Sequence, residues 1–225
     1  MTIRNWPRLE RPREKLLSRG INSLSDAELL AVIFGSGIAG CDAVELARRA
    51  LARHGSIRGL IELNRNDFTA MSGLGDAKFV ALQAGVEIGR RALHDEMISS
   101  SPITDATAAK AYLVAELGAR SREAFCAIFL DNRYRVIAFE ILVVGTIDSA
   151  TVHPREVVAR VLELRAAAVI FAHNHPSGVS EPSAADINLT RTLSQALKLI
   201  DVRVLDHFVV ARQQITSFAD RGLLE

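Results

Sequence analysis

The stretch 168–178, AVIFAHNHPSG, limits the fold of this chain more than any other segment. It begins with β-branched and aromatic residues, which are typical of a buried strand. Successive side chains of a strand point to opposite faces, so His173 and His175 share one face. Pro176 cannot donate to a neighbouring strand, and the Ser-Gly pair after it is typical of a turn. We therefore expect the strand to end just beyond the second histidine. Both imidazoles then lie at an open carboxyl end, where α/β folds bind their ligands.

Helices and strands alternate on both sides of this stretch. Pro154 is tolerated at the first position of a helix, and apolar residues follow it at helical spacing. The sequence predicts, in order, a helix from Thr104 or Asp105, strands at 122–131 and 134–146, a helix from Pro154, the strand with the histidines, a helix at 183–199, a strand at 202–210 and a tail. This alternation predicts an α/β (α+β) domain, in which a mixed β-sheet is flanked by helices.

The first part of the chain carries helical signals only. From residue 13 to about residue 97, short apolar runs alternate with caps and glycines, and Ser25 with Glu28 has the spacing of a capping box. A polar, proline-terminated segment follows at 98–101. We therefore expect an all-α domain at 1–97, a linker at 98–101 and the mixed-sheet domain at 102–225.

A glycine-rich turn lies inside the helical part. Gly73 and Gly75 precede a new helix that carries Lys78, and the segment resembles a helix-hairpin-helix element. Exposed backbone N–H groups at a helix start favour an anion, and the lysine adds a positive charge nearby. One interpretation is weak, sequence-independent contact between these three residues and DNA phosphates. The other, weighted equally, is an ordinary helical hairpin in which the glycines serve packing.

Charge and hydropathy exclude several classes of protein. The formal net charge is +1, which argues against an extended nucleic-acid-coating surface, because phosphate binding depends on many Lys and Arg contacts. No run approaches the roughly 18 apolar residues of a membrane helix, and the Arg-rich start lacks the apolar stretch of a signal peptide. We expect a cytoplasmic protein that enters no membrane. Cys41 and Cys126 are isolated and are expected to be buried thiols.

Ser183 and Asp186, downstream of the two histidines, indicate a candidate metal site. Two imidazoles on one strand face can both reach a zinc ion at about 2.0–2.1 Å, and a carboxylate can complete three protein ligands. Asp186 follows His175 by eleven residues, after a loop long enough to bring a helix start back to the strand end. Ser183 and Asp186 also fit a capping box, which explains those two residues but not the histidine pair. Three protein ligands leave a fourth position for water, as in catalytic zinc sites.

The whole pattern is similar to a known family. HNHPSG at 173–178 with PSAAD at 182–186 resembles the JAMM metallopeptidase motif, H-x-H-x7-S-x-x-D, at every motif position. The segments ERPREKLL, LSDAELL, VHPREVV and LDH, with the GLG hairpin, resemble the RadC branch over nearly the whole chain. The resemblance implies an MPN-type domain from about residue 102 and one zinc ion held by His173, His175 and Asp186. It also implies that Ser183 supports the oxyanion of the intermediate.

The motif also requires an upstream glutamate as general acid/base, and Glu123, Glu140 and Glu156 compete for this role. Domains of the family carry it at the start of the first strand after the first helix, the place that Glu123 occupies. Glu140 lies within the next extended segment, and the helix dipole explains Glu156 in the first turn of a helix. We therefore expect Glu123 as the base. His207, beside an aspartate in the last predicted strand, is expected to support a metal ligand or to be a structural core residue.

Three functions compete for these residues. The leading interpretation is a zinc metallopeptidase that cleaves an amide or isopeptide bond of a protein or peptide substrate, with Glu123 moving the proton of the attacking water. The rival is a DNA-repair-associated protein that binds DNA through its helical domain and uses the second domain as an inactive interaction module. A metal-dependent nuclease ranks last, because such enzymes more naturally use several carboxylates and paired metals.

Overall fold

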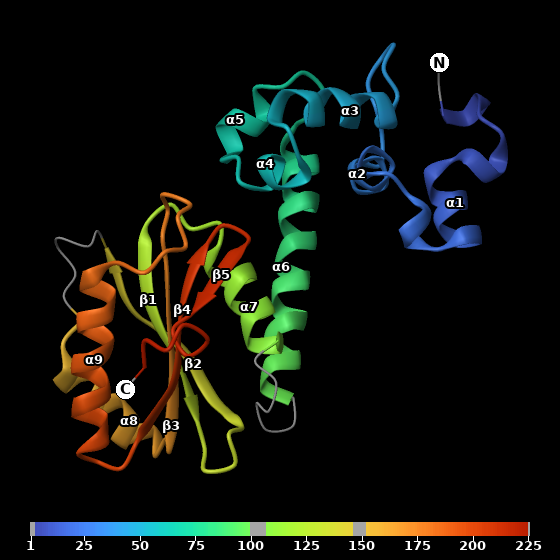
Figure 1. The fold of residues 1–225 in the computed structure, drawn as a ribbon. Coiled ribbons are helices and arrows are strands. Elements are labelled where there is room, and N and C mark those ends of the chain that lie inside the picture. Colours follow the sequence, from blue (N-terminus) through green and yellow to red (C-terminus); the bar gives the residue numbers. More distant parts are fainter. Residues whose placement is uncertain (1–2, 100–106, 146–151, 225) are drawn as a thin grey trace. The chain divides into compact units, whose positions relative to one another are not determined.

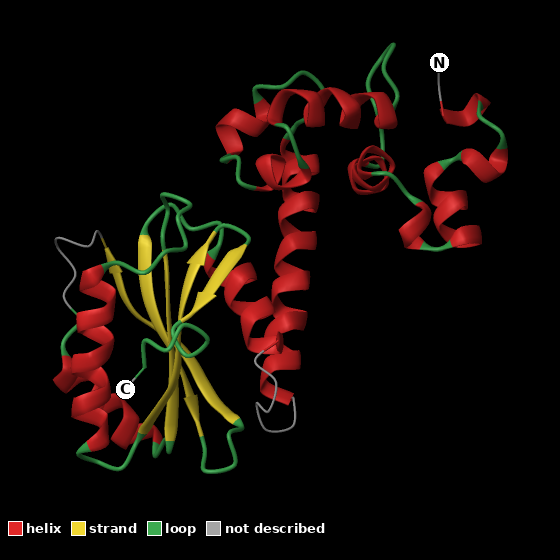
Figure 2. Ribbon diagram, viewed as in Figure 1, coloured by secondary structure: helices red, strands yellow, loops and turns green. Residues whose placement is uncertain are grey.

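The computed structural model describes residues 3–99, 107–145 and 152–224. It divides into two compact units, Met1–Gly89 and Arg90–Glu225. Figures 1 and 2 show helices in the first unit and helices around a sheet in the second. Residues 98 and 99 of the expected linker at 98–101 are the last residues of a helix, and the rest of the linker lies outside the described residues. The helix cap expected at 104 or 105 also lies outside them. The domain limits expected from sequence therefore stay a prediction.

The first unit is helical, as predicted. Its α2 (Asp26–Phe34) begins with the predicted capping box, in which Glu28 N–H donates to the Ser25 hydroxyl and Ser25 N–H donates to the Glu28 carboxylate. The apolar faces of its helices pack around a core that includes Phe68. The other elements are η1 (Ile3–Asn5), η2 (Arg8–Glu10), α1 (Pro12–Arg19), η3 (Ile21–Ser23), α3 (Ala43–His54), α4 (Ile57–Ile61), α5 (Arg65–Thr69) and the first part of α6 (Asp76–Ser99).

The second unit contains a five-stranded mixed sheet with helices on both faces (Figure 1). In spatial order its strands are β2 (Val136–Gly145), β1 (Glu123–Leu130), β3 (Ala168–Asn174), β4 (Arg203–Ala211) and β5 (Gln214–Ser217). β3 and β4 run parallel, whereas the other neighbours are antiparallel. The predicted fold class is thus confirmed. The segment predicted as a tail contains β5, an edge strand that the sequence did not indicate.

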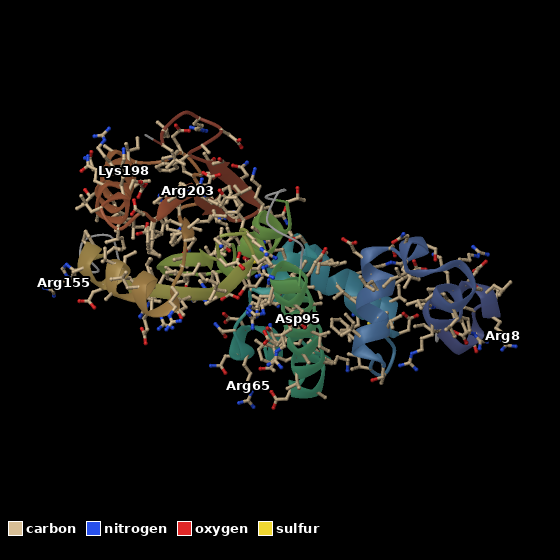
Figure 3. The ribbon with its side chains drawn as sticks, turned by 90° about the horizontal axis from the view of Figure 1, so that it is seen from below. Arg8, Arg65, Asp95, Arg155, Lys198 and Arg203 are labelled. Carbon is tan, nitrogen blue, oxygen red and sulfur yellow. The ribbon has the colours of Figure 1, made fainter. Side chains whose placement is uncertain are left out.

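Two helical layers enclose this sheet. One face packs against α7 (Thr107–Leu117) and the end of α6, and the other against α8 (Pro154–Leu164) and α9 (Ala184–Lys198). The outer sides of α8 and α9 carry charged residues such as Arg155 and Lys198 (Figure 3). Burial on both faces explains why β1 and β3 are almost continuously apolar in sequence. Cys41 and Cys126 are buried free thiols, as predicted. Of the helices in the described ranges, none is long and apolar enough to cross a membrane.

Candidate metal centre

The two histidines lie at the carboxyl end of β3, on the sheet face that α8 and α9 cover. His173 is the penultimate residue of the strand and pairs with Phe125 of β1, and His175 follows the strand's last residue. Residues that pair across two strands share a face, and Phe125 belongs to the core beneath α8 and α9. Both imidazoles are nearly buried, with 6% and 9% of the residue surface exposed.

A glycine turn fixes the ring of His175. Gly178 N–H donates to the His175 carbonyl at 3.0 Å, and Gly178 has a φ of 84°, which residues with a side chain rarely adopt. The turn brings the Val179 carbonyl to 2.8 Å from His175 Nδ1. Because a carbonyl can only accept, Nδ1 carries the proton and donates it. In the neutral ring, Nε2 is left with a lone pair that faces the site.

The start of α9 brings a carboxylate to the histidines. Asp186 N–H donates to Ser183 Oγ at 3.2 Å, and Ser183 N–H donates to Asp186 Oδ2 at 2.7 Å, so the capping box is complete. The same bonds orient the carboxylate toward the strand. Asp186 Oδ1 lies 3.4 Å from His173 Nε2, and Oδ2 lies 3.5 Å from His175 Nε2. Capping and metal ligation are therefore compatible in this side chain, and the two sequence interpretations do not compete.

The side chains of His173, His175 and Asp186 hold their ligand atoms at separations that suit a metal ion. His173 Nε2 and His175 Nε2 are 3.0 Å apart. Asp186 Oδ1 lies 3.4 Å from His173 Nε2, and Asp186 Oδ2 lies 3.5 Å from His175 Nε2. A tetrahedral zinc ion with ligands at about 2.0–2.1 Å has ligand atoms about 3.3 Å apart. One ligand atom from each of the three side chains can be chosen so that all three atoms lie within 4.8 Å of one another. His173, His175 and Asp186 can therefore hold a metal ion.

The charges of the cluster also favour a cation. Burial alone would raise the pKa of Asp186, but the neighbouring imidazoles of His173 and His175 outweigh this effect, and the pKa is lowered. The carboxylate is therefore ionised at neutral pH. Its hydrogen bond in turn raises the pKa of His175 above the ordinary value, against the effect of burial. A proton on the imidazole thus takes the place that a metal ion would fill.

Glu123 begins β1 beside the cluster. Phe125 pairs with His173 in the antiparallel ladder, so the same register continued by two residues puts Glu123 across from His175, on the same face. Burial raises the pKa of the Glu123 carboxyl; the charges of His175 and His173 lower it, and that of Asp186 raises it. The carboxylate thus lies within electrostatic reach of all three ligands.

The two rival glutamates have partners elsewhere. Glu140 on β2 accepts a hydrogen bond from Arg160 of α8 at 2.8 Å, and this bond lowers its pKa. Glu156, in the first turn of α8, pairs with Arg155 at 3.0 Å. The structure therefore brings Glu123, and not these two, next to the histidines.

Asn174, between the two histidines, clamps the start of β1. Its Oδ1 accepts from Ala124 N–H at 2.8 Å, and its Nδ2 donates to the carbonyls of Arg120 and Arg122 at 3.2 and 3.1 Å. These bonds hold the backbone on both sides of Glu123. Sequence reasoning missed Asn174. A polar residue within an apolar strand was the available signal, but its partners lie about fifty positions earlier in the chain.

His207 lies behind His173 and is not one of the three ligands. Its fully buried ring has Nε2 at 2.8 Å from His173 Nδ1. On the other side, its Nδ1 is 2.5 Å from Thr190 Oγ1, and the Thr190 hydroxyl donates to the Asp186 carbonyl at 2.6 Å. Burial lowers the pKa of His207 well below its ordinary value, so the ring is neutral. The sequence indicated His207 but not Thr190.

The predicted anion site lies at the turn before α6. Gly73 has a φ of 89°, and the Lys78 N–H donates to the Gly75 carbonyl at 3.0 Å. Asp76 places a carboxylate at the first position of α6, where Arg65 binds it with two hydrogen bonds of 2.8 and 2.7 Å. The helix start therefore already has a negative charge of its own. Phosphate binding by Gly73, Gly75 and Lys78 stays a prediction.

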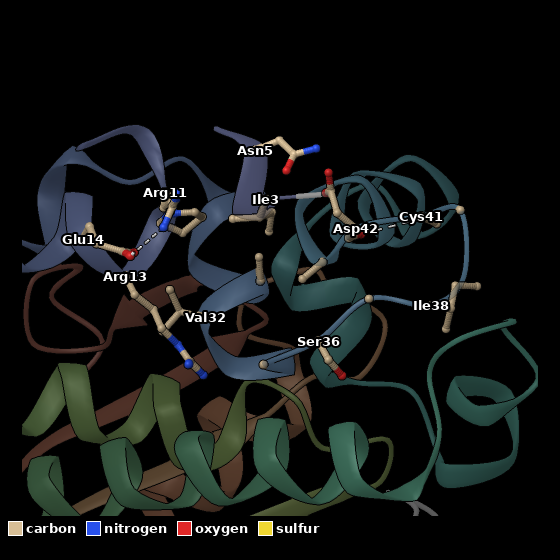
Figure 4. Close-up of a pocket in the computed structure, with 16 residues that line it drawn as sticks. Ile3, Asn5, Arg11, Arg13, Glu14, Val32, Ser36, Ile38, Cys41 and Asp42 are labelled. Atoms are coloured by element: carbon tan, nitrogen blue, oxygen red, sulfur yellow. Dashed lines mark hydrogen bonds and ion pairs between the residues drawn. The ribbon is translucent and has the colours of Figure 1, made fainter. Parts of the chain in front are cut away.

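The helical unit also contains a cavity of about 890 Å³ (Figure 4). It lies between the N-terminal residues 3–14 and the loop that joins α2 to α3. None of the residues predicted for a site lines it. Its carboxylates have structural partners, since Glu14 pairs with Arg11 and Asp42 caps α3. Although larger than a single metal site requires, this cavity lacks a converging set of catalytic groups.

Comparison with known proteins covers both parts of the chain. The family model of a RadC-like JAB domain matches residues 103–223, and that of a UPF0758 N-terminal domain matches residues 3–80. A UPF0758 protein of Nitrosococcus oceani is 55% identical over 100% of both chains. UPF0758 proteins of Halorhodospira halophila and Acidithiobacillus ferrooxidans are 53% and 52% identical, over 100% and 99% of both chains, respectively.

Proposed function

The chain belongs to the UPF0758 family of RadC-like JAB domain proteins, and from this premise we propose that it is a zinc metallopeptidase that cleaves an amide or isopeptide bond of a protein or peptide. One observation carries the proposal: His173 Nε2, His175 Nε2 and the Asp186 carboxylate oxygens lie 3.0–3.5 Å from one another across the three side chains, close to the spacing of a tetrahedral ligand set. Two imidazoles and one carboxylate favour zinc over magnesium or calcium, which prefer all-oxygen sites.

The protein's own groups divide the chemistry between them. When bound, zinc supplies Lewis-acid activation of a water and of the scissile carbonyl. Glu123 accepts the proton that the water loses as its oxygen bonds to the carbonyl carbon. It then gives that proton to the amine nitrogen as the C–N bond breaks. The raised pKa of Glu123 suits both transfers, because proton exchange is most effective when the pKa approaches the working pH.

Ser183 assists the same step in this proposal. Its oxygen accepts the Asp186 N–H, while its hydroxyl proton has no acceptor in the described part of the chain. That proton is available to the oxyanion that develops on the substrate carbonyl. The N-cap role of Ser183 and its proposed role as a donor therefore use different parts of one hydroxyl.

The test compares matched glutamate variants after zinc loading. Glu123→Gln should keep the wild-type zinc content and lose about 10²- to 10⁴-fold in turnover of a peptide and isopeptide library. Glu140→Gln is the control and should keep its turnover, because its carboxylate is bonded to Arg160. The inactive Glu123→Gln protein also serves as a trap for co-purifying substrate. Unchanged hydrolysis by Glu123→Gln would move the base to another residue.

A second candidate function is weak binding of the DNA backbone by the helical unit. Arg49, Arg53 and Ser72 line a cavity of about 200 Å³ beside the glycine turn, and Arg53 and Lys78 have no ion-pair partner among the residues with described positions. Anisotropy titrations with unrelated duplexes should show binding that weakens steeply between about 50 and 200 mM salt. Lys78→Glu should weaken it and Lys198→Glu should not. Binding to DNA with no hydrolysis of any peptide would favour this function over the first.

A further inference from the structure

We propose that His207 is a positioning residue, which accepts the His173 Nδ1 proton and so directs the His173 Nε2 lone pair at the metal. The inference rests on the proposed metal site and extends it to a relay of three side chains, His173, His207 and Thr190. These side chains come from β3, β4 and α9, so the relay ties together three elements that meet at the site.

The proton positions follow from the acceptors at the end of the relay. The Thr190 hydroxyl has one proton, and at 2.6 Å it faces the Asp186 carbonyl, which can only accept. Thr190 Oγ1 must then accept from His207 Nδ1, which lies 2.5 Å away. His207 is fully buried between this hydroxyl and another imidazole, an environment that favours the neutral ring.

The neutral His207 ring then determines the tautomer of His173. With its proton on Nδ1, His207 presents an Nε2 lone pair to His173 Nδ1 at 2.8 Å. When a metal ion occupies Nε2, His173 must therefore carry its one proton on Nδ1 and donate it to His207. His175 is fixed in the same tautomer by the Val179 carbonyl. Each histidine ligand thus has its own acceptor for the Nδ1 proton, and this acceptor directs the ring's Nε2 toward the metal ion.

Ring packing is the competing explanation for a buried His207. Its ring stacks on Phe218 with centroids 4.6 Å apart, and it meets Phe125 edge to face at 5.5 Å. A residue kept for packing could be replaced by phenylalanine without loss. If His207 instead serves as the acceptor of the His173 proton, glutamine could replace it. The glutamine amide oxygen can accept in place of Nε2, although glutamine has no ring. The two explanations therefore predict opposite results for these two substitutions.

The experiment measures zinc affinity of the full-length protein by competition with a chromophoric chelator, and it adds the visible spectrum of the cobalt(II)-loaded protein. His207→Phe should weaken zinc binding about 10- to 100-fold and change the cobalt spectrum. His207→Gln should stay within a few-fold of wild type and keep that spectrum. Circular dichroism and thermal melting of the metal-free proteins separate these effects from a failure to fold.

A second pair of variants acts one step further along the relay. Thr190→Val keeps the side-chain shape but removes the acceptor of the His207 Nδ1 proton, which lets both imidazoles exchange tautomers. It should weaken zinc binding, and Thr190→Ser should restore it. If the His207 variants do not fold, the two Thr190 variants still test the positioning role of His207.

The experiment distinguishes failure of the positioning role from failure of the proposed metal site. Wild-type protein that binds zinc, with His207→Phe or Thr190→Val binding it equally tightly and giving the wild-type cobalt spectrum, would overturn the positioning role alone. Wild-type protein that binds neither zinc nor cobalt would overturn the proposed metal site, and the positioning role with it.

Discussion

Replacing Asn174 by alanine tests how the structure holds the general base in place. Asn174 is 2% exposed and makes three hydrogen bonds to the chain that surrounds Glu123. The substitution leaves the buried Ala124 N–H without a partner, which costs about 1–3 kcal/mol. The carbonyls of Arg120 and Arg122 belong to residues that reach water, so their lost bonds cost about 0.5 kcal/mol each. We expect a total destabilisation of about 2–4 kcal/mol.

Hydrogen exchange gives the most direct readout of this change. The Ala124 amide should exchange much faster in Asn174→Ala than in wild type, because its acceptor is gone. Urea unfolding followed by circular dichroism measures the accompanying loss of stability. Asn188→Ala on the exposed side of α9 is the matched control and should change stability by less than about 0.5 kcal/mol.

The same variant separates the base from the metal ligands. Since the hydrogen bonds of the Asn174 side chain go to the segment around Glu123, zinc content should stay at the wild-type level while turnover falls. An Asn174→Ala protein with unchanged Ala124 exchange and unchanged stability would refute the clamp. Loss of zinc together with turnover would show that the residue instead supports β3.

Three further predictions concern other parts of the site. The stability difference between wild type and Glu140→Gln should be fully present above the unfolded pKa of about 4.3. Because the bond to Arg160 lowers the folded pKa of Glu140, that difference should vanish as the pH falls through the lowered value, in denaturation curves recorded from pH 7 downward. Ser183→Ala should cost about 1 kcal/mol of stability through the lost cap and should lower turnover in kinetic assays while zinc stays bound. Gly178→Ala should cost about 1–2 kcal/mol because of its positive φ, and should weaken zinc binding in chelator competition, since the turn positions the acceptor of His175.

Local signals in the sequence were enough for the elements that carry the metal ligands. The apolar run before His173, the proline after His175 and the Ser183–Asp186 spacing each depend on neighbouring residues only. They correctly predicted a turn and a capped helix start, and a strand that ends at the histidine pair, although β3 ends at Asn174 and not beyond His175. The mixed sheet followed from the same alternation of helices and strands.

What the sequence could not supply depends on strand register. The parallel pairing of β3 with β4 puts His207 opposite Phe171 and within reach of His173, and no local pattern contains that register. The clamp by Asn174 similarly requires the antiparallel pairing of β1 with β3. The missed strand β5 is short, with four residues, and its pairing with β4 forms after a tight turn that the sequence signalled weakly.

The most direct test of the account is the zinc content of the full-length protein after loading and exhaustive dialysis. We predict one zinc ion per chain in wild type and in the control His153→Ala, whose exposed side chain lies outside the cluster. His173→Ala should retain none, and Asp186→Asn, which preserves the helix cap, should bind zinc more weakly. Wild-type protein without zinc, or His173→Ala with the wild-type stoichiometry, would contradict the assignment of the metal centre.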